Sequence, residues 1–205
     1  MRGPEDASEL VRGPSIVLAP GAEHEFEWTI EDLGGAPIAQ IGVEIGNGSR
    51  ADGTVYLDYL TWEGTPKVNF MEPGDGSSMW RKAWVTGVDI FGERWWPDSY
   101  RLVQNEGRGL LMQGTCDWTD YQANSTVTIH LAKAAGIAAR VQGLRRYYAI
   151  LLCDDGKARL IKALDGDTVL AEADFPWRQG GIHDFHLAVT GGRIQAGIDG
   201  KQQFD

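Results

Sequence analysis

The stretch Gly136-Ile-Ala-Ala-Arg-Val-Gln-Gly-Leu-Arg-Arg-Tyr-Tyr-Ala-Ile-Leu-Leu-Cys153 carries two apolar runs on either side of a short turn. Each run predicts one strand of a sheet, because alternation with period two is typical of a half-buried strand. Successive side chains of a strand point to opposite faces. We therefore expect Ala139 and Val141 to enter the core, and Arg140 and Gln142 to face outward.

The turn between these strands carries two arginines, Arg145 and Arg146, followed by two tyrosines, Tyr147 and Tyr148. The two tyrosines must point to opposite faces of the sheet. We expect Tyr148 to join the apolar residue Leu152 in the core and Tyr147 to face outward. Guanidinium, amide and phenol groups on one face suit a ligand rich in hydroxyls or phosphates.

A purely structural reading of the same turn is also open. In that reading, Arg145 and Arg146 serve only to form ion pairs with Asp154, Asp155 or Glu172. Such pairs are common on sheet surfaces and contribute little to stability. The sequence does not choose between a binding face and a structural face.

The charge balance argues against nucleic-acid and membrane partners. The chain of 205 residues has 29 acidic and 19 basic residues, a net charge of -10 and a pI near 4.8. It therefore repels phosphate backbones and anionic lipids. The start of the chain, Met1–Asp6, lacks the apolar core of a signal peptide, so we expect a cytoplasmic protein. Cys116 and Cys153 are expected to be reduced, partly buried thiols.

Strand patterns separated by Gly, Pro and Asp turns run along most of the chain and predict an all-β fold, an antiparallel β-sandwich. We expect three parts: a partial jelly-roll β segment at 1–65, a Pro- and Gly-rich linker at 66–79, and the β-sandwich at 80–205. The expected strands of the sandwich are 100–104, 108–112, 121–131, 137–142, 147–153, 157–163, 167–173, 183–190 and 193–198.

Aromatic residues are dense in the segment 80–100, which holds four tryptophans. We favour a hydrophobic plug there, because packing is the commonest role of such large apolar side chains. A sugar-stacking surface is the alternative. Trp118 and Tyr121 form a second aromatic pair and a candidate stacking platform. His130 shares the outward parity of Thr126 on the same strand, so we expect it to extend the polar face.

Three stretches together resemble the concanavalin/laminin-G-like jelly roll: Trp118-Thr-Asp-Tyr121, Ala134–Ala149 and Asp199-Gly-Lys201. More narrowly, they resemble the accessory region that follows the catalytic domain in some bacterial ADP-ribosylglycohydrolase-family proteins. The segment Gly53–Pro66 is similar to the closing strands of galactose-binding-like, carbohydrate-binding jelly rolls. The resemblance implies a jelly-roll fold and a carbohydrate or ADP-ribose ligand. In such families the second jelly roll continues past Phe204, so we expect a sandwich truncated at its C-terminus.

The sequence predicts no catalytic residue. Jelly-roll glycoside hydrolases place paired carboxylates on one strand face. The nearest pattern, Glu23-x-Glu25-x-Glu27, has no aromatic subsite beside it and is read as a solvated face.

No metal site or cofactor is predicted either. His183 and His186 are three residues apart, so on a strand they point to opposite faces and cannot share a metal. We expect His186 to face outward. The acidic segments 153–156 and 164–167 are typical of hairpin turns, which need no calcium ion to explain them.

The sequence therefore predicts a non-catalytic module that binds a carbohydrate or ADP-ribose. The expected ligand-binding residues are Arg140, Gln142, Arg145, Tyr147, Trp118, Tyr121 and His130. A structural module that packs on a neighbouring domain or self-associates is the alternative, and a jelly-roll glycoside hydrolase ranks third.

Overall fold

The computed structural model describes residues 4–31, 33, 38–46, 52–63, 66–72, 74, 76–92 and 99–205. The chain divides into two compact units. The hairpin unit comprises Met1–Trp62, Lys67–Val85 and Gly92–Arg101, and the sandwich unit comprises Glu63–Pro66, Thr86–Phe91 and Leu102–Asp205. The predicted domain borders at 65/66 and 79/80 stay a prediction.

Regular structure in the described residues is almost entirely β, as the alternating patterns predict. A short 3-10 helix, η1 (Met79–Ala83), precedes four strands of three residues each: β1 (Val85–Gly87), β2 (Ile90–Gly92), β3 (Arg101–Val103) and β4 (Leu110–Met112). The longer strands follow: β5 (Tyr121–Thr128), β6 (Ala134–Gly143), β7 (Arg146–Cys153), β8 (Lys157–Leu164), β9 (Asp167–Asp174), β10 (Ile182–Thr190), β11 (Arg193–Ile198) and β12 (Lys201–Phe204). None of the helices in this described part is long and apolar enough to cross a membrane.

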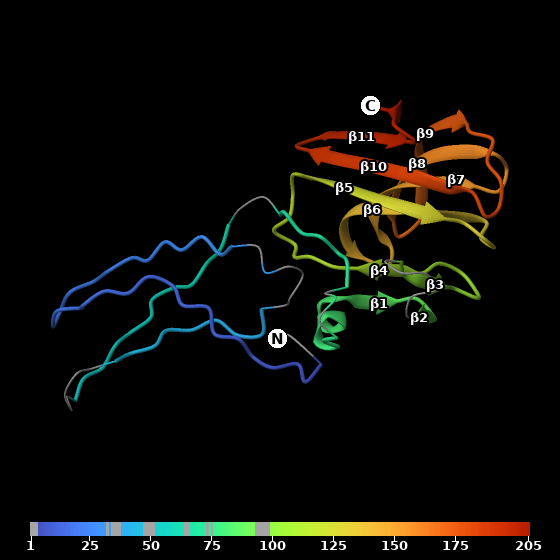
Figure 1. The fold of residues 1–205 in the computed structure, drawn as a ribbon. Coiled ribbons are helices and arrows are strands. Elements are labelled where there is room, and N and C mark those ends of the chain that lie inside the picture. Colours follow the sequence, from blue (N-terminus) through green and yellow to red (C-terminus); the bar gives the residue numbers. More distant parts are fainter. Residues whose placement is uncertain are drawn as a thin grey trace. The chain divides into compact units, whose positions relative to one another are not determined.

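Two antiparallel four-stranded sheets form the sandwich (Figure 1). One has the strand order β12-β11-β10-β5 and is called the front sheet here; the other has the order β6-β7-β8-β9 and is called the back sheet. The short strands pair as β1 with β4 and β2 with β3. The all-β class and the antiparallel sandwich are thereby confirmed. The part expected to form an additional partial β-sandwich segment at the N-terminus consists of small hairpins (Figure 1).

The main core lies between the two sheets. Phe185, Leu187 and Val189 of β10 are at most 2% exposed and alternate with more exposed neighbours, as the period-two pattern predicts. Ile150 and Leu152 of β7 belong to the same buried cluster and have no exposed surface. Full burial of one such side chain contributes about 1.5–3 kcal/mol, so these rows dominate the stability of the unit.

A second buried cluster lies on the other face of the back sheet. It contains Tyr147 and Ala149 of β7 and Ile161 of β8, and Leu110 of β4 packs against it. Strand β7 is therefore covered on both faces. This explains why its sequence is a nearly continuous apolar run and not an alternating one.

A β-bulge in β6 corrects one expectation about the opening stretch. Arg140 has a φ of 51°, and the pairing register between β6 and β7 shifts between Ala139 and Gly143. Ala139 lies in the main core as predicted. The extra bulge residue reverses the parity after it, so Val141 packs against the second cluster and not in the main core.

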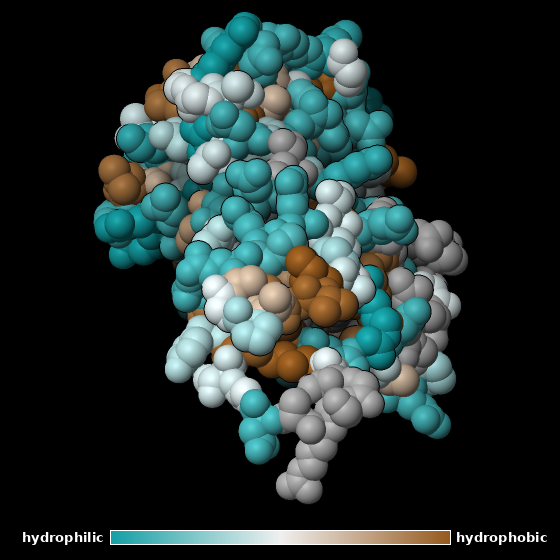
Figure 2. Space-filling view, turned by 90° about the vertical axis from the view of Figure 1, so that its left-hand side faces the viewer, coloured by the Kyte–Doolittle hydropathy of each residue, from teal (hydrophilic) through white to brown (hydrophobic). Residues whose placement is uncertain are grey.

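The hairpin unit is extended but has little regular pairing. Its first turn is closed by a hydrogen bond from the Ala22 amide to the Ala19 carbonyl oxygen, 3.0 Å apart. Within the expected partial β segment at 1–65, the described residues 8–31, 38–46 and 52–63 contain no assigned strand. Large apolar side chains reach the surface of this unit, for example Val17 at 96% and Tyr56 at 83% exposure, and apolar surface is visible in Figure 2.

The aromatic residues described in the segment 80–100 pack on one another. Trp80 is 5% exposed and stacks on Tyr100 with ring centroids 5.5 Å apart. Trp84 lies 5.2 Å from Phe70 and 6.0 Å from Tyr100. These contacts favour the predicted packing role. Trp95 and Trp96 lie outside the described residues.

Both cysteines are free thiols. Cys153 is buried at the end of β7, and burial raises the pKa of its thiol. Cys116 is exposed and not partly buried as expected.

Replacement of Leu187 by Ala should lower the free energy of unfolding of the sandwich unit by about 2–5 kcal/mol, because it leaves a cavity between the sheets. Amide hydrogen exchange in β7 and β10 measures the unfolding free energy of the sandwich unit separately from that of the hairpin unit. Leu164→Ala, at a position 55% exposed, is the matched control and should cost less than about 1 kcal/mol. Equal losses in the two variants would contradict this assignment of the core.

Candidate functional site

Three of the sequence-predicted site residues meet at one end of the sandwich. Trp118 and Tyr121 contact each other edge to face with ring centroids 6.4 Å apart. The Tyr121 hydroxyl oxygen accepts a hydrogen bond of 2.5 Å from the backbone amide of Arg140. The two aromatic rings and the β6 bulge thus form a single corner.

The guanidinium of Arg140 is occupied by the protein itself. It donates to the backbone oxygens of Thr119 at 2.7 Å and Gly191 at 2.8 Å, and to the Asp120 carboxylate at 3.0 Å. Asp120 also accepts a hydrogen bond of 2.9 Å from the Gly191 amide. Arg140 therefore ties the start of β5 to the turn after β10, and its donors point to these protein acceptors.

Tyr147 does not face solvent, contrary to the expectation. It does lie on the face of β7 opposite the main core, as its parity requires, but β4 covers that face and only 5% of Tyr147 is exposed. Burial raises the pKa of its phenol, and the guanidinium of Arg108 lies 5.6 Å from the ring centroid. Gln142 is exposed, so the expected outward row is interrupted between Gln142 and Tyr147.

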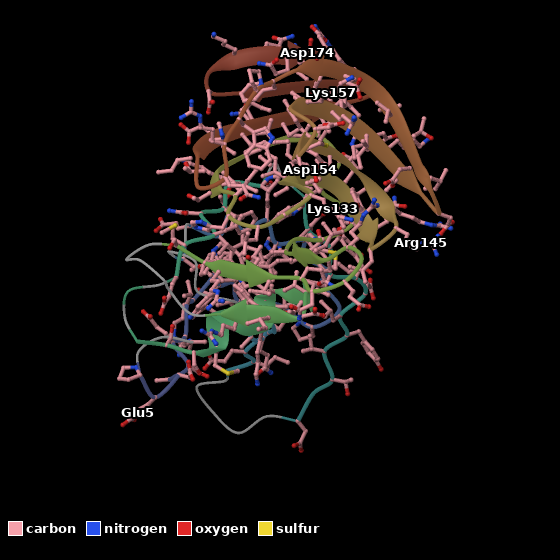
Figure 3. All side chains as sticks on the ribbon, turned by 90° about the vertical axis from the view of Figure 1, so that its right-hand side faces the viewer. Glu5, Lys133, Arg145, Asp154, Lys157 and Asp174 are labelled. Atoms are coloured by element: carbon pink, nitrogen blue, oxygen red, sulfur yellow. The ribbon has the colours of Figure 1, made fainter. Side chains whose placement is uncertain are left out.

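The arginines of the β6–β7 turn pair with a different turn from the one expected. Arg145 donates to the Asp165 backbone oxygen at 3.0 Å, and Arg146 pairs with the Asp165 carboxylate at 3.1 Å. Asp155 and Glu172 pair with Arg159 instead. The reason is that Arg145 and Asp154 lie at opposite ends of β7, as Figure 3 shows.

His130 is exposed in the bend that follows β5. Strand β5 is about 24 Å long, and Tyr121 is its first residue. His130 is therefore at the other end of the front sheet from the Trp118 corner. The structure brings Trp118, Tyr121 and Arg140 together and leaves His130 apart from them.

A polar row that the sequence reading missed crosses the outer face of the front sheet. Asn124 pairs in register with His186, His186 with Gly197, and Gly197 with Gln202. Residues in cross-strand register share a face, so this row crosses all four strands. Beside it runs a second row, in which Gln122 pairs with Ala188 and Ala188 with Gln195.

The outer face is hollowed where these rows reach β11 and β12. The hollow has a volume of about 230 Å³ and is lined by His186, Gln195, Gly197, Gly200, Lys201 and Gln202. Gly197 lets β11 and the backbone of Lys201 approach closely here, because a Cβ at this position would lie 2.9 Å from the Lys201 backbone oxygen. Asp199 and Gly200, both with positive φ, form the tight turn that connects β11 to β12 beside the hollow.

Hydrogen bonds orient the side chains around the hollow. His186 Nδ1 lies 2.8 Å from the Asn124 amide oxygen, and an amide oxygen only accepts hydrogen bonds. Nδ1 therefore carries a proton, and Nε2 is left for a ligand. The amide nitrogens of Gln195 and Gln202 each donate to Asp205 at 3.3 Å, which leaves their carbonyl oxygens as acceptors.

The carboxylate of Asp205 is neutralised beside the hollow. Arg193 Nε donates to it at 2.5 Å, and this charge-assisted bond lowers the pKa of Asp205 to about 2. The carboxylate is thus ionised at neutral pH with its charge balanced by the guanidinium. The described residues contain no group of three or more His, Cys, Asp or Glu side chains that could hold a metal ion.

Part of this site was visible in the sequence. The outward parity of Thr126 and His186 was predicted, and the alternation Gln122-x-Asn124 gives the same signal on β5. The register that brings Asn124, His186 and Gln202 into one row depends on pairing between strands far apart in the chain. No local pattern specifies that register.

Comparisons with known proteins give one relevant likeness. No protein-family model and no curated protein matches the chain. The solved structure of the carbohydrate-binding module CBM66 from Bacillus subtilis is similar to this chain, with a TM-score of 0.51 and 17% sequence identity. The match covers 60% of this chain and 78% of that one. At this identity the likeness supports the sandwich fold, and no link to ADP-ribosylglycohydrolase proteins is shown.

Replacement of Arg193 by Gln should raise the pKa of the Asp205 side chain from about 2 toward the ordinary value near 3.9. Because this pKa is lower in the folded than in the unfolded state, the ion pair stabilises the fold above about pH 4. This stabilisation is lost as the pH falls toward 2 and the carboxylate is protonated. Carboxyl-carbon NMR titration measures the shift. Arg146→Gln should leave Asp205 unchanged, and an ordinary pKa in the unmodified chain would refute the pairing.

Proposed function

We propose that the chain is a non-catalytic carbohydrate-binding module and that its ligand lies in the hollow on the front sheet. The observation that carries the proposal is the cross-strand row of amide and imidazole groups from Asn124 to Gln202, which ends in that hollow. The likeness of the fold to a carbohydrate-binding module supports it.

The groups around the hollow match the chemistry of a sugar. Each sugar hydroxyl both donates and accepts a hydrogen bond. His186 Nε2 and the carbonyl oxygens of Gln195 and Gln202 accept from hydroxyls, and the Lys201 ammonium donates to them. Gly197 in the lining has no side chain, and Ala188 in the neighbouring row has a small one.

The size and lining of the hollow indicate that it binds one sugar unit at the end of a chain, and binds it weakly. A volume of about 230 Å³ is below the roughly 300–1,000 Å³ of pockets that enclose drug-sized ligands, so one sugar unit fits best. No aromatic ring is among the residues that line it. We therefore expect dissociation constants of about 0.1–10 mM for single chain ends.

Binding and not hydrolysis is the chemistry that this lining supports. A glycoside hydrolase needs two carboxyl groups about 5–9.5 Å apart around the bond that is cleaved. The residues that line the hollow include no carboxylate. The nearby Asp205 is held by Arg193, Gln195 and Gln202.

The Trp118 corner is the second place where a sugar chain could stack. The Trp118 ring lies against Gly114, where an added Cβ would come within 2.6 Å of it. Arg140 and Gln142 belong to the same end of β6, but Arg140 has its donors occupied. We propose Trp118 as an auxiliary contact and place the main contacts at His186, Gln195 and Gln202.

The double replacement Gln195→Ala, Gln202→Ala should weaken glycan binding about tenfold or more, because two acceptors are lost. Affinity gel electrophoresis against a panel of soluble polysaccharides suits the expected weak binding. Thr168→Ala and Leu170→Ala in the exposed strand β9 serve as the matched pair of controls and should bind normally. Binding that survives the Gln changes and is lost on Trp118→Ala would move the site to the Trp118 corner; a folded chain that retains no glycan would refute the function.

A second candidate function, self-association, is favoured by the exposed apolar side chains of the hairpin unit. Val17, Tyr56 and Leu57 are 96%, 83% and 64% exposed, and apolar surface of this extent is typical of an interface. Sedimentation velocity of the full chain should then show an oligomer at micromolar concentration. Val17→Asp with Leu57→Asp should shift it to monomer, whereas Val169→Asp in β9 should not. A monomer in all three cases excludes this candidate.

A further inference from the structure

We infer that the sugar unit in the hollow carries an anionic group, a carboxylate or a phosphate, and that the Lys201 ammonium binds it. This inference rests on the proposed function. It concerns the class of ligand, whereas the preceding argument concerned hydroxyl groups alone.

The backbone holds Lys201 firmly at the rim of the hollow. Lys201 is the first residue of β12 and pairs in register with Ile198, which is fully buried. It directly follows the tight turn at Asp199 and Gly200. Its backbone oxygen is the atom that a Cβ on Gly197 would meet. The stem of the side chain therefore starts from a fixed point, and only its flexible end must be ordered by a ligand.

The carboxylates around Lys201 have other partners. Asp199 lies 2.9 Å from His183 Nδ1 and accepts from the Asp184 amide at 2.9 Å. Asp184 accepts from the Thr126 hydroxyl at 2.6 Å. Against the opposing effect of burial, the hydrogen bonds with His183 and the Asp184 amide lower the pKa of Asp199, and the charge of Lys201 adds to this through space. Within the described residues Lys201 makes no ion pair closer than 4.0 Å, and it belongs to the lining of the hollow.

The lining of the hollow has the opposite charge from the chain as a whole. The net charge is -10, yet the residues that line the hollow include one lysine and no acid. Charges farther away than about 8–10 Å are largely screened at physiological ionic strength. Of the acids beside the hollow, Asp205 is paired with Arg193 and Asp199 is hydrogen-bonded to His183, so the Lys201 ammonium is the lining charge that favours an anion at contact distance.

The other lining groups determine which chemical groups the ligand carries beside its anionic group. His186 Nε2 and the amide oxygens of Gln195 and Gln202 are acceptors, so they bind hydroxyls and repel a second oxyanion. An anionic group at the β12 rim with hydroxyls toward β10 satisfies all of these atoms. A uronic acid offers this pattern through its carboxylate and ADP-ribose offers it through its diphosphate.

The test uses the full chain and pairs of ligands that differ only in charge. Oligogalacturonate is compared with its carboxyl-reduced form, and ribose 5-phosphate with ribose, by NMR titration of the front-sheet amides. In at least one of the two pairs, the charged ligand should bind about tenfold more tightly than its neutral counterpart. Addition of 500 mM salt should reduce this difference in affinity. Carboxylate and phosphate are distinguished by which pair shows the preference.

Variants assign the preference to one side chain. Lys201→Met should abolish the preference for the charged ligand, so that the charged and the neutral member of a pair bind with similar affinity. Lys201→Arg keeps the positive charge and should retain most of the preference. Lys162→Met removes a lysine from the back sheet and serves as the control, with no expected effect.

Two outcomes overturn the inference, and they are distinguishable. Equal binding of charged and neutral ligands with no effect of Lys201→Met shows that the hollow takes neutral sugars, and the proposed function remains. Absence of binding by any of these ligands and by the polysaccharide panel, in a chain with intact amide dispersion, refutes the proposed function together with this inference.

Discussion

The apolar layer between the two four-stranded sheets is the constraint on which the rest of the sandwich unit depends. The buried rows of β7 and β10 fix which face of each strand points inward. With Phe185, Leu187 and Val189 buried, His186 and Ala188 must lie on the outer face of the front sheet. The candidate site is thus a consequence of the core, since a slip by one residue would move every polar group of the row to the interior.

The class of the fold was readable from the sequence, and most strands were too. Nine strands expected from alternation correspond to β3–β11, whereas β12 and the short strands β1 and β2 were missed. Short strands leave too few residues for a period to show. In the hairpin unit the alternating patterns correspond to extended chain without regular pairing, because alternation reports which side chains are apolar and not whether a partner strand is present.

The candidate site was less predictable, for two physical reasons. First, the bulge at Arg140 reverses the parity of Val141, and nothing in the local sequence required a positive φ at an arginine. Second, the burial of Tyr147 depends on β4, a strand of three residues that is far away in the chain. The residues of the hollow come from β10, β11 and β12, so only the register of the sheet reveals that they belong together.

The close approach of Gly197 to the Lys201 backbone bears on the entropic cost of binding a ligand. The residues that line the hollow belong to the paired strands β10, β11 and β12 and to the tight turn between β11 and β12. A ligand would therefore not have to order a loop, and the entropic cost of association falls mainly on one flexible lysine and the sugar itself. Such a rigid surface can exchange partners quickly, so that several copies on one polysaccharide would gain retention through avidity although each contact is weak.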